Sequence, residues 1–199
     1  IVSTGTPPYS YQWDNGLTPD KKHEDLYVNT TTTYRVTVTD DLGIANTASA
    51  TLTVNQRPTA NVNSPSICSG KTATLNATGG TTFTWNTTVT GASLTTAALT
   101  ANADYWVEVT DANGCKDTAS STVTVNPNPE VTLSFDPICA SATTYNLTGS
   151  ATPVGGTFTL NGVTITSFNP SSAGAGNHSI TYQYEDGNGC VDAETKTLQ

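Results

Sequence analysis

Charge, and basic charge above all, is scarce in this sequence. Of 199 residues only 12% are charged, and Lys and Arg number 7 against 16 Asp and Glu, which gives a formal net charge of −9. An acidic chain without a basic patch repels phosphate backbones, so we expect no nucleic-acid partner. Because no apolar run approaches 18 residues, we also expect no membrane insertion. The low charged fraction argues against a charge-rich disordered tail.

Methionine and a recognisable signal sequence are missing too. The chain begins inside a repeat and ends before its last strand pattern is complete, so we interpret it as a piece of a longer exported protein. Histidine occurs twice, as His23 and His178, and neither lies in a recognised catalytic or metal-binding motif. We therefore expect surface histidines and a protein that is not an enzyme.

What the sequence does contain is a repeat. Residues 34–55 align without a gap to residues 105–126 at a constant offset of 71, with identical residues at 13 of 22 positions. A more diverged third copy covers residues 180–199. A period near 70 residues is too long for a solenoid turn and suits a small β-sandwich, so the repeat predicts tandem copies of one domain.

Alternating Val and polar residues, Asx-Gly turns and a Trp strand opposite a Tyr-x-Val-x-Val strand predict the fold. We expect an all-β protein of three tandem immunoglobulin-like β-sandwiches in a rod-like array. The predicted domains are residues 1–56, N-terminally incomplete, 57–127 and 128–199. Pro-bearing stretches at residues 55–59 and 126–130 are the expected linkers.

Four cysteines divide between the second and third predicted domains. The spacings are similar, 115 − 68 = 47 and 190 − 139 = 51. Three pairings are possible for four cysteines, and we expect one bridge inside each domain, Cys68–Cys115 and Cys139–Cys190, because the pair recurs with the repeat. Such bridges would stabilise domains with small cores. Metal binding is the alternative, but two distant cysteines without nearby His make a poor zinc site.

Two further patterns are candidate sites. Asp40, Asp41, Asp111 and Asp186 lie at hairpin ends, where they could hold calcium. The alternative is that they stabilise turns by accepting local backbone hydrogen bonds, and no other cofactor is expected. Trp106 falls between inward-facing positions and should point outward, as a platform for a sugar ring or a partner, unless a neighbouring strand or domain covers it.

The segments TGTPPYSYQWDNG, ICSGKTATLNATGG and YWVEVTDANGC resemble the PKD-like and immunoglobulin-like repeats of large bacterial surface adhesins, including gliding-motility adhesins. The third copy is similar to a sister PKD-like type. The resemblance implies secretion by the type IX route and a location at the cell surface. It also implies an O-glycan at Thr118, because Asp117-Thr118-Ala119 matches the acceptor pattern.

We therefore expect a structural or adhesive repeat region of an extracellular bacterial surface protein or filament, acting as a stalk or spacer. Its partners would be neighbouring repeats, other copies of the chain or a surface polysaccharide. The alternative function is that of carbohydrate-binding accessory domains in a secreted polysaccharide-degrading enzyme. A row of exposed aromatic residues would favour this alternative, whereas a Trp106 buried at a domain joint would favour the spacer.

Overall fold

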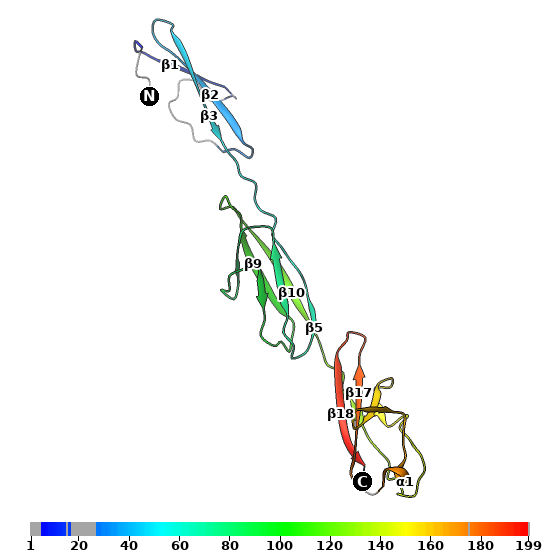
Figure 1. Ribbon diagram of the computed structural model, residues 1–199. Coiled ribbons are helices and arrows are strands. Elements are labelled where there is room, and N and C mark those ends of the chain that lie inside the picture. Colours follow the sequence, from blue (N-terminus) through cyan, green and yellow to red (C-terminus); the bar gives the residue numbers. More distant parts are fainter. Residues whose placement is uncertain (1–4, 15, 17–26, 175, 199) are drawn as a thin grey trace. The chain divides into compact units, whose positions relative to one another are not determined.

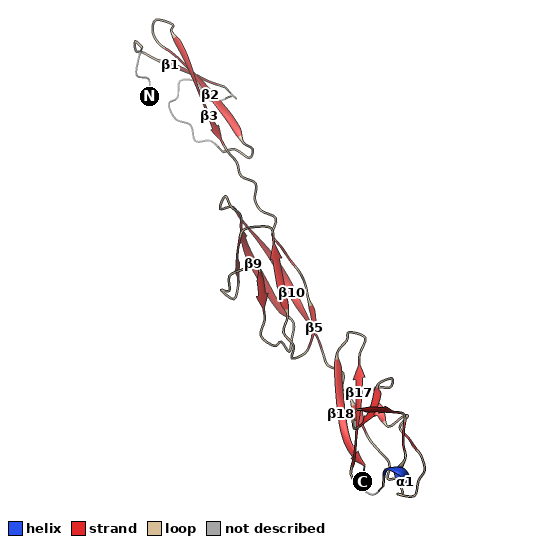
Figure 2. Cartoon of the chain, in the orientation of Figure 1, coloured by secondary structure: helices blue, strands red, loops and turns tan. Residues whose placement is uncertain are grey.

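The computed structural model describes residues 5–14, 16, 27–174 and 176–198 (Figure 1). Strands dominate, and the described residues contain one short helix, α1 (Pro170–Ala173) (Figure 2). The chain forms two compact units: Ile1–Pro58 with Thr110–Lys116, and Thr59–Val109 with Asp117–Gln199. The all-β fold predicted from the alternating pattern is confirmed. Within the described part of the chain, no helix is both long and apolar enough to cross a membrane.

The first repeat forms a three-stranded antiparallel sheet in the order β1-β2-β3. Its strands are β1 (Ser10–Trp13), β2 (Thr32–Thr39) and β3 (Ala45–Leu52). Only Tyr34 of this sheet is buried, and every residue of β3 is exposed. Threonine pairs across β2 and β3, such as Thr33 and Thr51 with oxygens 2.8 Å apart, add cross-strand hydrogen bonds.

The second repeat is a sandwich of two sheets, ordered β5-β10-β9-β7 and β4-β6-β8. The strands are β4 (Asn61–Val62), β5 (Ser66–Cys68), β6 (Thr74–Thr78), β7 (Thr82–Trp85), β8 (Ser93–Thr95), β9 (Ala103–Thr110) and β10 (Lys116–Asn126). Alternate side chains meet between the sheets around Trp85, which is 1% exposed, with Leu75 and Val107 fully buried. The indole N–H of Trp85 donates to the Gly91 carbonyl at 2.9 Å, so the buried ring keeps a polar partner.

The third repeat is built on a four-stranded sheet, β15-β14-β17-β18, with two short pairs, β11-β13 and β12-β16. The strands are β11 (Thr132–Leu133), β12 (Tyr145–Asn146), β13 (Ala151–Thr152), β14 (Thr157–Leu160), β15 (Val163–Ile165), β16 (Ser167–Phe168), β17 (His178–Glu185) and β18 (Val191–Leu198). Its core has two clusters, one around Leu133 and Tyr182 and one around Leu147 and Ile180. Among the described residues, no strand spans the predicted boundaries at 56–57 and 127–128, and the division into three domains stays a prediction.

Candidate functional site

A turn with the same hydrogen bonds closes one hairpin in each repeat. In the third repeat, Asp186 Oδ1 accepts the backbone N–H groups of Asn188 and Cys190, both at 2.8 Å. Asp111 Oδ1 accepts from Asn113 and Cys115 at the same distances. In the first repeat Asp40 Oδ1 accepts from Leu42 and Ile44, at 3.0 and 2.8 Å. We call the segments 40–44, 111–115 and 186–190 the Asx turns.

These contacts account for the aligned aspartates as turn-forming residues. The backbone N–H of Ile44 holds the pKa of Asp40 below its usual range, and the N–H of Cys190 does the same for the pKa of Asp186. Asp41 is exposed and makes its backbone contact to the Thr6 carbonyl. Among the described residues, no three His, Cys, Asp or Glu side chains are grouped as metal ligands would be. Calcium binding at these aspartates stays a prediction.

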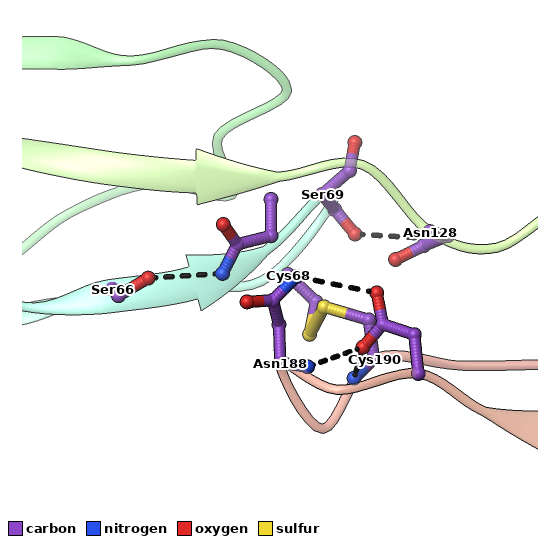
Figure 3. The surroundings of a disulfide bond; sticks show 8 residues. Ser66, Cys68, Ser69, Asn128, Asn188 and Cys190 are labelled. Atoms are coloured by element: carbon purple, nitrogen blue, oxygen red, sulfur yellow. Dashed lines mark hydrogen bonds between the residues drawn. A yellow bond between two sulfur atoms is a disulfide. The ribbon is translucent and has the colours of Figure 1, made fainter.

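The disulfide of the structure joins two successive repeats. Cys68, at the end of β5, is bonded to Cys190 in the Asx turn of the third repeat, with Cα atoms 5.5 Å apart (Figure 3). Cys115 and Cys139 are free thiols. The predicted pairing, Cys68–Cys115 and Cys139–Cys190 inside each domain, is thus wrong in this structure.

Strand geometry explains why a bridge inside the second repeat fails. Cys68 lies opposite Asn126, the last residue of β10, whereas Cys115 directly precedes Lys116, the first. At about 3.3 Å per residue, the 11 residues of β10 separate these positions by roughly 35 Å. A disulfide needs Cα atoms within about 7 Å. The two cysteines of one repeat therefore lie at its opposite ends.

The third repeat repeats this separation. Cys190 precedes the first residue of β18, while Ile138, the neighbour of Cys139, packs against the cluster that contains Leu198 at the last residue of that strand. Eight residues of β18 correspond to roughly 25 Å. A cysteine at the Cys68 position of one repeat therefore meets a cysteine at the Cys190 position of the next repeat, and not the one in its own repeat.

The linker beside this disulfide is hydrogen-bonded to the residues on either side of Cys68. The Ser69 N–H donates to the Asn126 carbonyl at 2.8 Å, and the Asn128 side chain donates to the Ser69 carbonyl at 3.4 Å. Asn126 also donates through its side chain to Ser66 Oγ at 2.9 Å. These asparagines were not singled out from the sequence. Their place next to prolines in Asn-Pro-Asn-Pro is the signal that could have identified them as linker anchors.

A second candidate site lies on the outer face of the second repeat. Trp106 of β9 is 49% exposed, as its position in the alternating pattern predicted. Its ring lines a shallow groove of about 260 Å³ together with Thr118, Ala119 and Ser120 of β10. The structure thus brings together two residues selected independently from the sequence, Trp106 and Thr118. An exposed indole beside hydroxyl groups can stack on a sugar ring and donate hydrogen bonds to it.

The groove holds one aromatic residue, whereas a row would have favoured carbohydrate binding. Asp117, which precedes Thr118, accepts the Ala60 backbone N–H at 3.0 Å. Asp192 accepts the Val131 N–H in the same way at 3.3 Å in the third repeat. Asp117 therefore holds Ala60, at the start of the repeat, through this hydrogen bond, in addition to its place in the predicted glycosylation pattern.

The histidines differ in what the structure says of them. His178 is half-buried, with Nε2 3.0 Å from the Gly174 carbonyl oxygen and its ring 5.1 Å from that of Phe168. His23 lies outside the described residues.

A larger groove of about 390 Å³ in the third repeat is lined by Val154, Gly155, Phe158 and Tyr182 among others. Its lining contains no ionisable side chain except that of Tyr182.

Comparison with known proteins agrees with the sandwich architecture. Residues 56–129 match the family model described as "Ig-like domain CHU_C associated". This match confirms the immunoglobulin-like assignment for the second repeat. No curated protein sequence matches the chain.

Solved structures resemble the chain only loosely. One belongs to a study of the host cell surface retention of a 1.5-MDa bacterial ice-binding adhesin, with 18% identity over 85% of this chain and 73% of that chain, and a TM-score of 0.40. A Ca²⁺-stabilized adhesin that helps an Antarctic bacterium to bind ice gives 17% identity, 83% and 55% coverage and a TM-score of 0.42. SGBP-B of Bacteroides ovatus, in complex with a mixed-linkage heptasaccharide, has 15% identity over 94% of this chain and 58% of that chain, with a TM-score of 0.21. With TM-scores below 0.5, these likenesses carry no argument about function.

Proposed function

We propose that the chain is a non-enzymatic stalk or spacer in an extracellular bacterial surface protein, where it projects or connects adhesive parts. The observation that carries this proposal is the Cys68–Cys190 disulfide between successive sandwiches. A bond between repeats adds a covalent connection beside the peptide linker, which is useful to a protein that must hold its ends apart. Disulfides are also typical of proteins outside the cytosol, where thiols are oxidised.

Several further features support this proposal. The second repeat matches an immunoglobulin-like family model, and the acidic, charge-poor composition suits a surface exposed to solvent. The side chain of Asn126 donates to Ser66 of β5 and that of Asn128 donates to the Ser69 carbonyl, which restrains the joint. The PKD-like assignment, the gliding-motility type and type IX secretion remain predictions within this proposal.

A surface-display experiment tests the spacer role. The full chain would be placed between an outer-membrane anchor and a terminal epitope tag, on cells that keep their surface polysaccharide. The matched control carries a Gly/Ser linker of the same residue count, which behaves as a flexible coil. We expect stronger antibody binding to the epitope on the folded chain. Equal or weaker binding than on the Gly/Ser control would contradict the spacer role.

The Trp106 groove supports carbohydrate binding as a second candidate function. Retention of the full chain on a panel of insoluble polysaccharides would be compared with that of Trp106→Ala. Tyr27→Ala is the matched control, because Tyr27 is an aromatic residue that is 98% exposed in the first repeat. Retention lost only in Trp106→Ala would establish the groove as a sugar site. Retention unchanged in both variants, or absent throughout, would rule it out for that panel.

Thr118 bears on the same experiment. Its side chain is exposed in the groove beside Trp106, so a glycan attached there would cover the indole. Expression in a host that modifies Asp-Thr-Ala sequences should then add the mass of a glycan to the chain, and Thr118→Val should remove the added mass. A mass unchanged in that host would refute the predicted modification.

A further inference from the structure

Cys139 begins a turn like the one that follows Cys68, the cysteine of the interrepeat bond. The two positions differ by 139 − 68 = 71 residues, the repeat offset. The Lys71 N–H donates to the Cys68 carbonyl at 3.1 Å, and the Ala142 N–H donates to the Cys139 carbonyl at 2.9 Å, so each cysteine opens a turn of the same kind. Ile67 and Ile138, which precede them, both pack against the core of their repeat. Cys139 is exposed and its thiol is free.

Cys115 has the local structure of the other half of that bond. Its N–H donates to Asp111 as the N–H of Cys190 donates to Asp186, and its carbonyl accepts the Asp111 N–H at 3.0 Å, against 2.9 Å for the Cys190 carbonyl and Asp186. The two free cysteines are therefore the same two half-sites that are bonded at Cys68 and Cys190.

We propose that Cys139 is a covalent docking site for the Asx turn of a further copy of this repeat, one with cysteine at the Cys190 position. The occupant follows from the chain itself, because Cys68, the counterpart of Cys139, is bonded to the cysteine of an Asx turn. Repeated along an array, this rule gives a series of bonds in which each repeat is joined to the next. It depends on the repeat structure alone, and the proposed spacer role could fail without affecting it.

The bond forms by thiol–disulfide exchange. The Cys139 thiolate attacks the disulfide of an oxidant such as oxidised glutathione, which gives a mixed disulfide and one glutathione thiolate. The thiolate of the Asx-turn cysteine then attacks the Cys139 sulfur and releases the second glutathione thiolate. Two cysteine thiols lose two protons and two electrons, and one molecule of oxidised glutathione gains both electrons.

The test extends the full chain with a fourth repeat. A second copy of residues 125–199 would follow Gln199, because Gln199 aligns with Thr124 through the Asx turns (199 − 75 = 124). In the added copy, Cys139→Ser removes the thiol that would have no partner. Val191→Ile gives the peptide that contains the turn cysteine of the added copy a mass different from that of the third repeat. After oxidation with glutathione, free thiols would be alkylated and the linked peptides mapped by mass spectrometry without reduction.

We expect two bonds, Cys68–Cys190 and Cys139 to the turn cysteine of the added copy, with Cys115 alkylated. Cys190→Ser in the added copy is the matched control, in which Cys139 should become alkylated again. A Cys139–Cys190 bond within the third repeat would overturn the proposal. So would an alkylated Cys139 in a chain whose added repeat shows its own unfolding transition by calorimetry, since that transition demonstrates that the repeat has folded.

Discussion

A single hydroxyl group in the third repeat offers the sharpest test of how that core is held together. Tyr182 is 2% exposed, and its ring lies 4.5 Å from that of Phe158. Its hydroxyl donates to the Pro153 carbonyl at 2.5 Å and accepts the Gly156 N–H at 2.6 Å. Tyr182→Phe keeps the packed ring and removes both hydrogen bonds. It leaves a carbonyl and an N–H group, both half-buried, without this partner.

The expected cost follows from those orphaned groups. A buried polar group left without its partner costs about 1–3 kcal/mol. Because Pro153 and Gly156 are only half-buried and water can reach them in part, we expect the free energy of unfolding of this repeat to fall by about 1–2 kcal/mol. For a domain of this size that change lowers the melting temperature by roughly 5–15 °C.

Calorimetry on the oxidised full chain is the appropriate assay. The chain has three tryptophans, Trp13, Trp85 and Trp106, and all precede the third repeat, so tryptophan fluorescence would not follow its unfolding. Tyr184→Phe is the matched control, since the structure gives that hydroxyl no hydrogen-bond partner among the described residues. A Tyr182→Phe transition shifted no further than that of Tyr184→Phe would refute the reasoning.

Three other predictions concern the turns and the junction. Because the pKa of Asp186 is lowered in the fold, its carboxylate stabilises the fold at pH values above the unfolded pKa of about 3.9, and this stabilisation is lost as the pH falls through the lower folded pKa. An NMR titration of Asp186 with a midpoint at or above the unfolded value would contradict this. Cys68→Ser, or reduction of the bond to Cys190, should lower the stability of the third repeat by up to about 4 kcal/mol, measured by calorimetry, and an unchanged transition would argue against the bond. Gly79→Ala should lower the free energy of unfolding, measured in urea, by about 2–4 kcal/mol, because at φ +108° the new Cβ would lie 2.0 Å from a backbone oxygen. Gly91→Ala is the control, since Gly91 has a similar φ of +113° but open space around it, and its loss should be clearly smaller. Equal losses in the two variants would contradict the steric account.

Local patterns in the sequence were sufficient for strands, turns and the direction of side chains. Val107 and Val109 are fully buried and Trp106 is exposed because side chains alternate along a strand, and the residues themselves report that alternation. The aspartate of each Asx turn was also recognisable, since its side chain acts on residues two and four positions later. These features depend on contacts between near neighbours.

The cysteine pairing could not be read in the same way. Similar spacings in two repeats show that each has one cysteine of each type, but they do not show at which end of the sandwich each lies. That information comes from the parallel register of β5 on β10, which places Cys68 beside Asn126. The groove formed by Trp106 and Thr118 has the same origin, because two strands bring together residues that the sequence separates. Pairings between strands, rather than patterns within them, decided both outcomes.

The Cys68–Cys190 bond also has a mechanical consequence. A pulling force applied to the two ends of the chain passes through this bond, so the residues between the two cysteines, which are 122 positions apart, cannot be stretched. At about 3.4 Å per extended residue, roughly 400 Å of polypeptide is withheld from extension until the bond is reduced. Under tension the oxidised chain would therefore lengthen far less than its reduced form, and the redox state of one bond would set how far it can yield.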